Sequence, residues 1–213
     1  MSVAIANAKP RGSLIVFEGC DRTGKTTQSE KLVDRLKQDG IETQLMKTPD
    51  RKSETGKLID RFLHNEIELE KHAAQLIFAA NRWEKIPEIK SLLSSGTTVV
   101  IDRYVASGVA YGAAMGLPVK WCSQNNVGHP EPDLVVYLKL SAEAASKRKG
   151  YGEERFEKEK IQQQIANTFD DLKEDSWKII DGDKSVEDIH AQIDNIAKQV
   201  IEESKFKELG TLE

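Results

Sequence analysis

Apolar and polar positions alternate along the chain with two periods, which follow one another in turn. Short runs rich in apolar and β-branched residues have the length of buried strands; they cover residues 14–17, 43–47, 97–102, 133–140 and 177–181. Between these runs, apolar residues recur every three to four positions, as in amphipathic helices. Strands that alternate with helices favour a parallel sheet covered on both faces. We therefore predict an α/β fold around a parallel five-stranded sheet.

The helical periods predict helices at 26–38, 57–63, 70–83, 86–93, 119–126, 141–149, 161–172 and 186–200. In segment 70–83, one apolar stripe is predicted to face the core; it consists of Ala73, Leu76, Ile77, Ala80 and Trp83. Phe78 and Arg82 are four positions apart and share a face offset from that stripe. Such a pair can hold a planar base, but spacing alone favours a core phenylalanine beside a surface arginine.

The composition fits one soluble globular domain of 213 residues, with 31 basic and 35 acidic side chains. No basic tract indicates a nucleic-acid partner, and no apolar window is long enough to cross a membrane. We expect residues 13–213 to form one domain after a flexible tail at 1–12, which has no signal peptide. The two cysteines lack a disulfide pattern, which favours a reducing compartment. A cytoplasmic location is therefore expected, and a nuclear one stays open.

A glycine-rich motif, G-x-x-x-x-G-K-T, stands between the first strand and the helix that follows. This order is what a phosphate-binding loop (P-loop) requires, because the loop amides and the helix N-terminus surround an anion. Lys25 can reach the β- and γ-phosphates of a nucleoside triphosphate, and the Thr26 hydroxyl can ligate Mg²⁺. We expect the loop residues to bind a nucleoside triphosphate; they are Gly19, Cys20, Asp21, Arg22, Thr23, Gly24, Lys25, Thr26 and Thr27.

The strand at 97–102 runs into Asp102 and Arg103. In an open α/β sheet, ligand chemistry lies beyond the carboxyl ends of the strands. Asp102 is therefore a candidate Mg²⁺ or water ligand facing the P-loop, and Arg103 a candidate phosphate clamp. Further along, a charged segment with glycines, placed at about 148–160, is a candidate mobile lid; the alternative is an exposed helical hairpin.

These features predict a protein that binds a nucleoside triphosphate with Mg²⁺. The chain lacks the N-K-x-D motif with which GTPases recognise guanine, and it is small for a mechanical ATPase. A lid and a second aromatic–arginine site favour phosphoryl transfer to a small acceptor. The four histidines have no metal-ligand spacing, so none is assigned a role.

Several segments together resemble thymidylate kinases of the eukaryotic type. They are FEGCDRTGKTTQ at 17–28, TPDRKSETGKLI at 48–59, FAANRWE at 78–84, VIDRYVASGVAY at 100–111, WCSQNNVGHPEPDLVVYLKL at 121–140 and YGEERFE at 151–157. The resemblance covers nearly the whole chain after residue 12. It implies a P-loop NTPase-type fold with a lid, and the transfer of a phosphoryl group from ATP to dTMP for dTTP synthesis. The family is usually a homodimer.

The resemblance also implies roles for individual residues. The catalytic set would be Arg22, which reaches the transferring phosphoryl group, with Lys25, Asp102 and Arg103. Thr26 and Asp102 would hold Mg²⁺. The adenine of ATP would lie against Arg148, beside the loop from Asp181 to Lys184.

On the acceptor side, the resemblance implies that Phe78 stacks on thymine and that Arg82 donates to its O4. The residues expected to surround the rest of dTMP are Asp21, Arg51, Arg103, Ser107, Gly108, Tyr111 and Gln162. Asp21 would meet the sugar 3′-hydroxyl, and Tyr111 would disfavour a 2′-hydroxyl. One departure concerns the lid, where the family often has E-R-Y but this chain has Phe156.

Two alternatives stay open. A deoxynucleoside kinase shares the P-loop and the D-R strand end, but it accepts an uncharged nucleoside and does not need Arg51 and Arg103 together. A non-catalytic nucleotide-binding module would tolerate the loss of Arg22 and Asp102, yet both residues are present.

Overall fold

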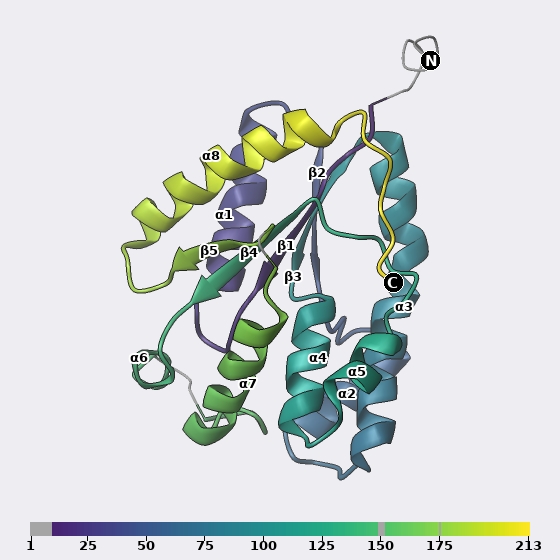
Figure 1. The fold of residues 1–213 in the computed structure, drawn as a ribbon, viewed down its shortest axis with the longest axis vertical. Helices are drawn as coiled ribbons and strands as arrows, with labels where there is room; N and C mark the ends of the chain where they lie inside the picture. Colours follow the sequence, from purple (N-terminus) through teal and green to yellow (C-terminus); the bar gives the residue numbers. More distant parts are fainter. Residues whose placement is uncertain (1–9, 149–151, 175) are drawn as a thin grey trace.

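The computed structural model describes residues 10–148, 152–174 and 176–213. Within these residues, five parallel strands form one sheet in the order β2-β3-β1-β4-β5 (Figure 1). The strands are β1 Leu14–Glu18, β2 Thr43–Lys47, β3 Thr98–Asp102, β4 Leu134–Lys139 and β5 Lys178–Asp181. The predicted α/β fold with a parallel five-stranded sheet is confirmed.

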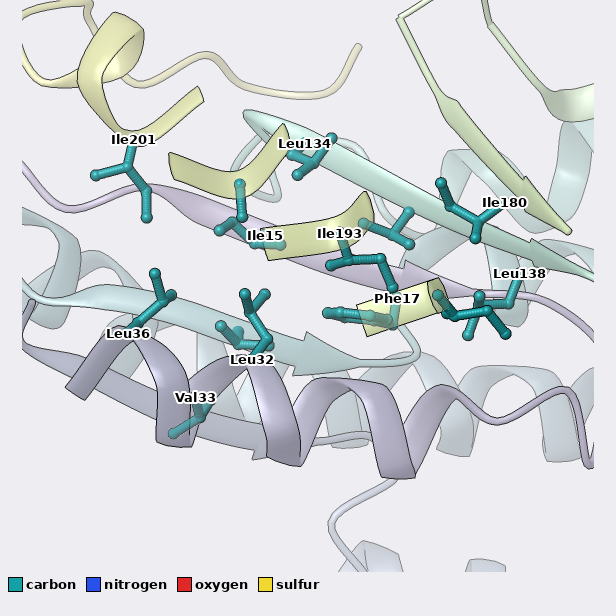
Figure 2. Close-up of a cluster of buried hydrophobic side chains, with 14 residues drawn as sticks. Ile15, Phe17, Leu32, Val33, Leu36, Leu134, Leu138, Ile180, Ile193 and Ile201 are labelled. Carbon is teal, nitrogen blue, oxygen red and sulfur yellow. The ribbon is translucent and has the colours of Figure 1, made fainter. Parts of the chain in front are cut away.

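Helices cover both faces of the sheet. They are α1 Lys25–Gln38, α2 Glu54–Leu63, α3 Lys71–Ser95, α4 Val105–Ala114, α5 Val119–Gln124, α6 Ala142–Ser146, α7 Glu159–Leu172 and α8 Val186–Ser204. Successive side chains of a strand point to opposite faces, so Ile15 and Phe17 pack with α1 and α8 (Figure 2). Leu14 and Val16 pack on the other face with Ile89 of α3. This double covering makes the strands buried on both sides and explains their continuous apolar runs.

The two helices predicted at 70–83 and 86–93 form one helix, α3, with Pro87 inside it. Proline has no N–H to donate and normally interrupts a helix. Ile86 and Ile89 on either side of Pro87 are buried at 3% and 1% exposure, and their packing keeps the helix continuous. A further helix, α4, forms in the small-residue segment after Tyr104, for which the sequence predicted no helix.

The predicted core stripe of α3 is wrong. Leu76 is 49% exposed and Trp83 is 40% exposed, and Ala73 and Ala80 are also exposed. The buried face instead includes the polar residues Gln75, Asn81 and Arg82. These side chains are buried because each has hydrogen-bond partners in neighbouring segments, a condition that hydrophobic periodicity does not register.

The predicted flexible tail, residues 1–12, includes two residues that the structure shows in contact with the rest of the chain. Residues 1–9 lie outside the described residues, but Arg11 pairs with Asp133 at 2.7 Å. The Gly12 amide donates to the Leu93 carbonyl at 2.8 Å. The last two residues of the predicted tail are therefore anchored. No helix in the described part of the chain is long and apolar enough to cross a membrane.

Candidate active site

A cavity of about 530 Å³ opens at the carboxyl ends of β1 and β3. It is bordered by the P-loop, the segment 48–51, helices α3 and α4, and the predicted lid. Many of the predicted site residues line it; they are Asp21, Arg22, Gly24, Lys25, Thr26, Thr27, Arg51, Phe78, Arg82, Arg103, Ser107, Gly108, Tyr111 and Arg148. Residues predicted for the donor and for the acceptor thus share one cavity.

The P-loop has the backbone that its glycines permit. Gly24, at φ 101°, precedes the first turn of α1 in a conformation that other residues rarely adopt. The buried Lys25 amine donates to the Cys20 carbonyl and lies 3.3 Å from the Thr23 hydroxyl. Burial, aided by the positive charge of Arg103, lowers the pKa of Lys25 to about 8. Because burial disfavours the charged amine, a negatively charged ligand at this site would stabilise its protonated form.

Cys20 lies in the same loop but is not suited to react. Its side chain is 5% exposed, and burial raises the pKa of the thiol to about 11. The thiolate is the nucleophilic form, so this shift makes Cys20 inert. Like Gly19 and Thr23, it contributes to the shape of the loop rather than to the lining of the cavity.

Thr26 lines the cavity and bonds to Asp102, which is not part of the lining. The Thr26 hydroxyl donates to Oδ2 of Asp102, whereas Oδ1 of Asp102 is buried without a hydrogen-bond partner in the described part of the molecule. A hydroxyl next to an unsatisfied carboxylate oxygen suits Mg²⁺, which takes one or two protein oxygens and fills its remaining positions with water and phosphate. The described residues contain no group of three His, Cys, Asp or Glu side chains that could hold a metal.

Arg103 ties the end of β3 to the P-loop. It has φ 68°, a left-handed conformation that is uncommon outside glycine, and its amide donates to the Phe17 carbonyl at 2.9 Å. Its guanidinium pairs with Asp21 and donates to the Gly19 carbonyl at 3.2 Å. Burial would raise the pKa of Asp21, but the positive charges of Arg103 and Lys25 lower it below its usual value. Asp21 is thus held as a carboxylate at the edge of the cavity.

Gln162 does not line the cavity. The side chain is fully buried, and its Nε2 donates to Oδ2 of Asp21 at 2.6 Å and to the Phe156 carbonyl at 2.9 Å. Its Oε1 accepts from the Asp21 amide at 2.8 Å. In this structure Gln162 holds Asp21 in place and does not face the cavity. The direct contact with the acceptor that we expected of Gln162 is replaced by contact through Asp21.

Glu157, a residue that sequence reasoning missed, connects the predicted lid to the P-loop. Arg22 donates from Nε to Oε1 of Glu157 at 2.9 Å. Oε2 of the same carboxylate accepts the amides of Gly152, Glu153 and Glu154 at 3.0 to 3.2 Å. Residues 149–151 of the predicted lid lie outside the described residues. Glu157 belongs to the motif YGEERFE at 151–157, which was the available signal.

Arg51, predicted to grip a phosphate, is paired with two carboxylates at the cavity edge. It donates to Asp60 of α2 at 2.8 Å and to Glu154 of the lid at 2.7 Å. The segment that carries Arg51 is fixed from below by Asn81 of α3, whose side chain exchanges hydrogen bonds with the backbone of Asp50. No pattern in the sequence indicated that Asn81 holds this segment.

Phe78 and Arg82 both line the cavity, so the interpretation of Arg82 as a surface residue, which rested on spacing alone, is wrong. Arg82 is 4% exposed, and burial lowers the pKa of its guanidinium to about 10. Its Nη2 has no hydrogen-bond partner among the described residues. Phe78 lies edge-on to Phe62 of α2, with ring centroids 6.4 Å apart. The pair therefore brings an aromatic ring and a guanidinium to one cavity.

Tyr111 of α4 and Phe156 of the predicted lid line the cavity next to each other. Their rings are perpendicular at 5.3 Å, and the Arg103 guanidinium lies 5.3 Å from the Tyr111 ring. Phe156 is 5% exposed, so the aromatic position of the lid is filled although its hydroxyl is missing. The Ser107 hydroxyl donates to Glu18, whose other oxygen accepts the amides of Tyr104 and Ser107. Sequence reasoning did not identify Glu18, which holds the start of α4.

The predicted adenine contacts are only partly brought together. Arg148 lines the cavity and donates to the carbonyls of Arg22 at 2.6 Å and Gly182 at 2.9 Å. It thereby joins the P-loop to the loop after β5. Asp181 and Lys184, which flank Gly182, do not line the cavity, and Asp181 accepts the amide of Asp183 at 3.0 Å.

The chain is similar to known proteins over most of its length. The family model described as thymidylate kinase matches residues 17–193. The thymidylate kinase of Homo sapiens is 43% identical over 209 residues, which cover 96% of this chain and 99% of that protein. The thymidylate kinase of Schizosaccharomyces pombe is 40% identical, with coverage of 89% and 93%. The solved structure of the thymidylate kinase from Candida albicans has a TM-score of 0.86 and 32% identity, covering 95% of this chain and 99% of that one.

Proposed function

This chain belongs to the thymidylate kinase family, and we infer that it transfers the γ-phosphoryl group of ATP to dTMP, giving ADP and dTDP. The observation that carries this function is the shared cavity. Lys25 and the P-loop line it together with Phe78 and Arg82, so a triphosphate and a flat base fit into one space. Because dTDP is the precursor of dTTP, the reaction serves DNA synthesis.

The charges of the cavity suit the meeting of two phosphate-bearing substrates. Phosphoryl transfer requires positioning and electrostatic stabilisation more than covalent help from the protein. The phosphate of dTMP is already an anionic nucleophile, so no general base is needed. The side chains that offset the repulsion between the substrates are Arg22, Lys25, Arg51 and Arg103.

Each of these positive groups has a separate task. Lys25 and the loop amides hold the phosphates of ATP, as the helix N-terminus favours. Arg22, anchored at Nε by Glu157, directs its charge toward the phosphoryl group in transfer. Arg51 and Arg103 hold the monophosphate of dTMP with the remaining donors of their guanidinium groups. Arg148 covers the adenine side of the P-loop.

We also propose that Mg²⁺ accompanies ATP at Thr26 and Asp102. The partnerless Oδ1 of Asp102 supports this assignment, because a buried carboxylate oxygen is costly unless a donor or a cation meets it. When bound, the ion offsets negative charge on the phosphate oxygens. The role of the two residues is to hold it next to the P-loop.

On the acceptor side, Phe78 stacks on thymine and Arg82 donates to its O4. Asp21, kept ionised by Arg103, is placed to accept the sugar 3′-hydroxyl. Tyr111 and Phe156 pack where they narrow the space around the sugar, which favours deoxyribose. Ser107 and Gly108 complete this side of the cavity, and Gln162 acts through Asp21.

The exposed apolar stripe of α3 supports a homodimer. Leu76 and Trp83 are 49% and 40% exposed on one helix face, and contiguous exposed apolar surface commonly marks an interface. Leu76→Asp should convert a dimer to a monomer in light scattering after gel filtration, whereas Val186→Asp on α8 should not. A wild-type protein that is monomeric at micromolar concentration would refute the dimer. We further propose a cytoplasmic location, which imaging of a fluorescent fusion tests, including for entry into the nucleus.

The function is tested by a coupled ADP-release assay with ATP and Mg²⁺, run in parallel with dTMP, thymidine, UMP and CMP. We expect turnover with dTMP and little with the other three. Turnover with thymidine instead would identify a nucleoside kinase. No turnover with any acceptor would show that the P-loop binds ATP without transferring its phosphoryl group.

A further inference from the structure

Arg82 is a buried cation without a carboxylate in direct contact among the described residues. It is 4% exposed, and its Nη2 has no hydrogen-bond partner in the described part of the chain. A buried guanidinium that lacks partners is costly, because its charge has lost the solvation by water. Arg82 also lines the cavity, so a ligand there can supply an acceptor to its guanidinium.

Asn126, just after α5, holds the opposite edge of this guanidinium. Its Oδ1 accepts from Nε of Arg82 at 3.0 Å, and its Nδ2 donates to the Cys122 carbonyl at 2.9 Å. The second bond fixes which end of the amide faces Arg82. Asn126 is 1% exposed and is not part of the cavity lining, so it does not meet the ligand itself.

Gly108 of α4 lets the guanidinium lie flat against the helix. A Cβ atom at Gly108 would come within 2.5 to 2.6 Å of Nη2, Cζ and Nη1 of Arg82. Such distances are too short for a carbon atom, so a side chain at this position would displace the guanidinium. The group is thus fixed on one edge by Asn126 and on one face by α4, in an arginine that lines the cavity.

We propose that Asn126 is a positioning residue that sets the acceptor base specificity through Arg82. This inference rests on the proposed function. With Nε bound to Asn126, Arg82 presents only donors to the base, since a guanidinium has no acceptor. A carbonyl at position 4 of the pyrimidine, as in thymine, meets the guanidinium donors as an acceptor. The amino group of cytosine at that position is a donor and is rejected.

Two adjacent asparagines provide a matched test. Asn125 and Asn126 each donate Nδ2 to the carbonyl four residues earlier, at 3.0 and 2.9 Å, but only Asn126 bonds to Arg82. Asn126→Ala should lower kcat/KM for dTMP roughly ten- to hundredfold, as expected for loss of a hydrogen bond to a charged group. The KM for ATP should change little. Asn125→Ala should leave both constants near those of the wild type.

A second substrate separates positioning from a structural defect. A dTMP analogue whose base is 5-methyl-2-pyrimidinone lacks O4 and offers Arg82 no acceptor. We expect Asn126→Ala to change kcat/KM for this analogue less than about threefold, because the lost bond matters only when O4 is present. An equal loss for dTMP and the analogue would overturn the positioning role. A wild-type enzyme that does not use dTMP would instead refute the proposed function.

Discussion

The phosphate loop at residues 19–27 and the base pocket, formed by Phe78, Arg82 and Gly108, lie in one cavity but are built differently. The loop is one continuous stretch, and its anion site is made of backbone amides and a helix N-terminus. The base pocket combines side chains of α3 with the backbone of α4 at Gly108. Its arginine is held by Asn126, 44 positions away in the chain.

This difference decides what each region needs from the rest of the fold. A site made from local backbone is specified wherever the loop sequence stands between a strand and a helix. A site made from side chains depends on which face of a helix is turned inward. Substitutions in the phosphate loop should therefore change mainly kcat. Substitutions in the base pocket should change mainly the KM for the acceptor.

The largest effect is expected at the phosphate loop. Arg22→Ala should lower kcat roughly a thousandfold, because an arginine that stabilises the phosphoryl group in transfer contributes on this scale. The affinity for ATP should fall only a few-fold. Steady-state kinetics and equilibrium binding measure the two quantities, with Arg35→Ala on the exposed side of α1 as the control. Equal losses in turnover and ATP affinity would exclude a role in the transition state.

The base pocket should show the opposite behaviour. Phe78→Ala should raise the KM for dTMP roughly ten- to hundredfold, since base stacking on an aromatic ring is worth about 1–3 kcal/mol. The KM for ATP should stay nearly constant. Lys90→Ala, at an exposed position of the same helix, is the control in the same assay. A comparable rise in the KM for ATP would show that the two regions are not separable.

The structure behind the base pocket should be sensitive to acid. His129 is fully buried between Trp83 and Tyr104, and neither ring nitrogen has a hydrogen-bond partner in the described part of the chain. Burial, together with the charge of Arg82, lowers the pKa of His129 to about 4. In the unfolded chain this histidine is protonated below about pH 6.5, whereas in the folded protein it stays neutral down to about pH 4. The free energy of unfolding therefore falls as the pH drops from about 6.5 to about 4.

We expect this histidine to account for a loss of roughly 2 kcal/mol over that range, allowing for solvent screening. Urea denaturation at pH 7 and pH 4.5 measures the loss. His129→Leu should reduce the difference between the two pH values by that amount. The prediction fails if wild type and variant lose stability equally.

The smallest effect concerns Lys25 in the phosphate loop. Its amine has a pKa of about 8 without ligand, and the phosphates of ATP favour the charged form. ATP binding at pH 8 should therefore take up about half a proton, and the apparent affinity should fall as the pH rises further. Calorimetry in buffers of different ionisation enthalpy measures the uptake. Lys37→Met on the exposed side of α1 should not alter it, and absence of uptake in the wild type would contradict the assignment.

The sequence predicted the sheet and the phosphate loop because both are recorded locally. The runs at 14–17 and 43–47 coincide with β1 and β2 to within one residue, and the glycine pattern gave Lys25 and Thr26 directly. Asp102 followed from its place at the end of an apolar strand. Each of these inferences used neighbouring residues only.

The base pocket was less predictable because α3 hides polar residues. Gln75, Asn81 and Arg82 are buried through bonds to distant segments, so apolar periodicity assigned the wrong face to the core. Resemblance to a family supplied Phe78 and Arg82, but it did not supply Asn126 or Glu157. Both act through hydrogen bonds to other residues, and such partners become visible only when the chain is folded.

The claim that one cavity holds donor and acceptor together is tested most directly with a single molecule that joins them, an adenosine–thymidine polyphosphate. The account predicts that it binds with one molecule per chain and competes with both ATP and dTMP. Phe78→Ala and Arg22→Ala should each weaken its binding, since it contacts both regions. Competition with only one substrate, or binding of two molecules per chain, would contradict the account.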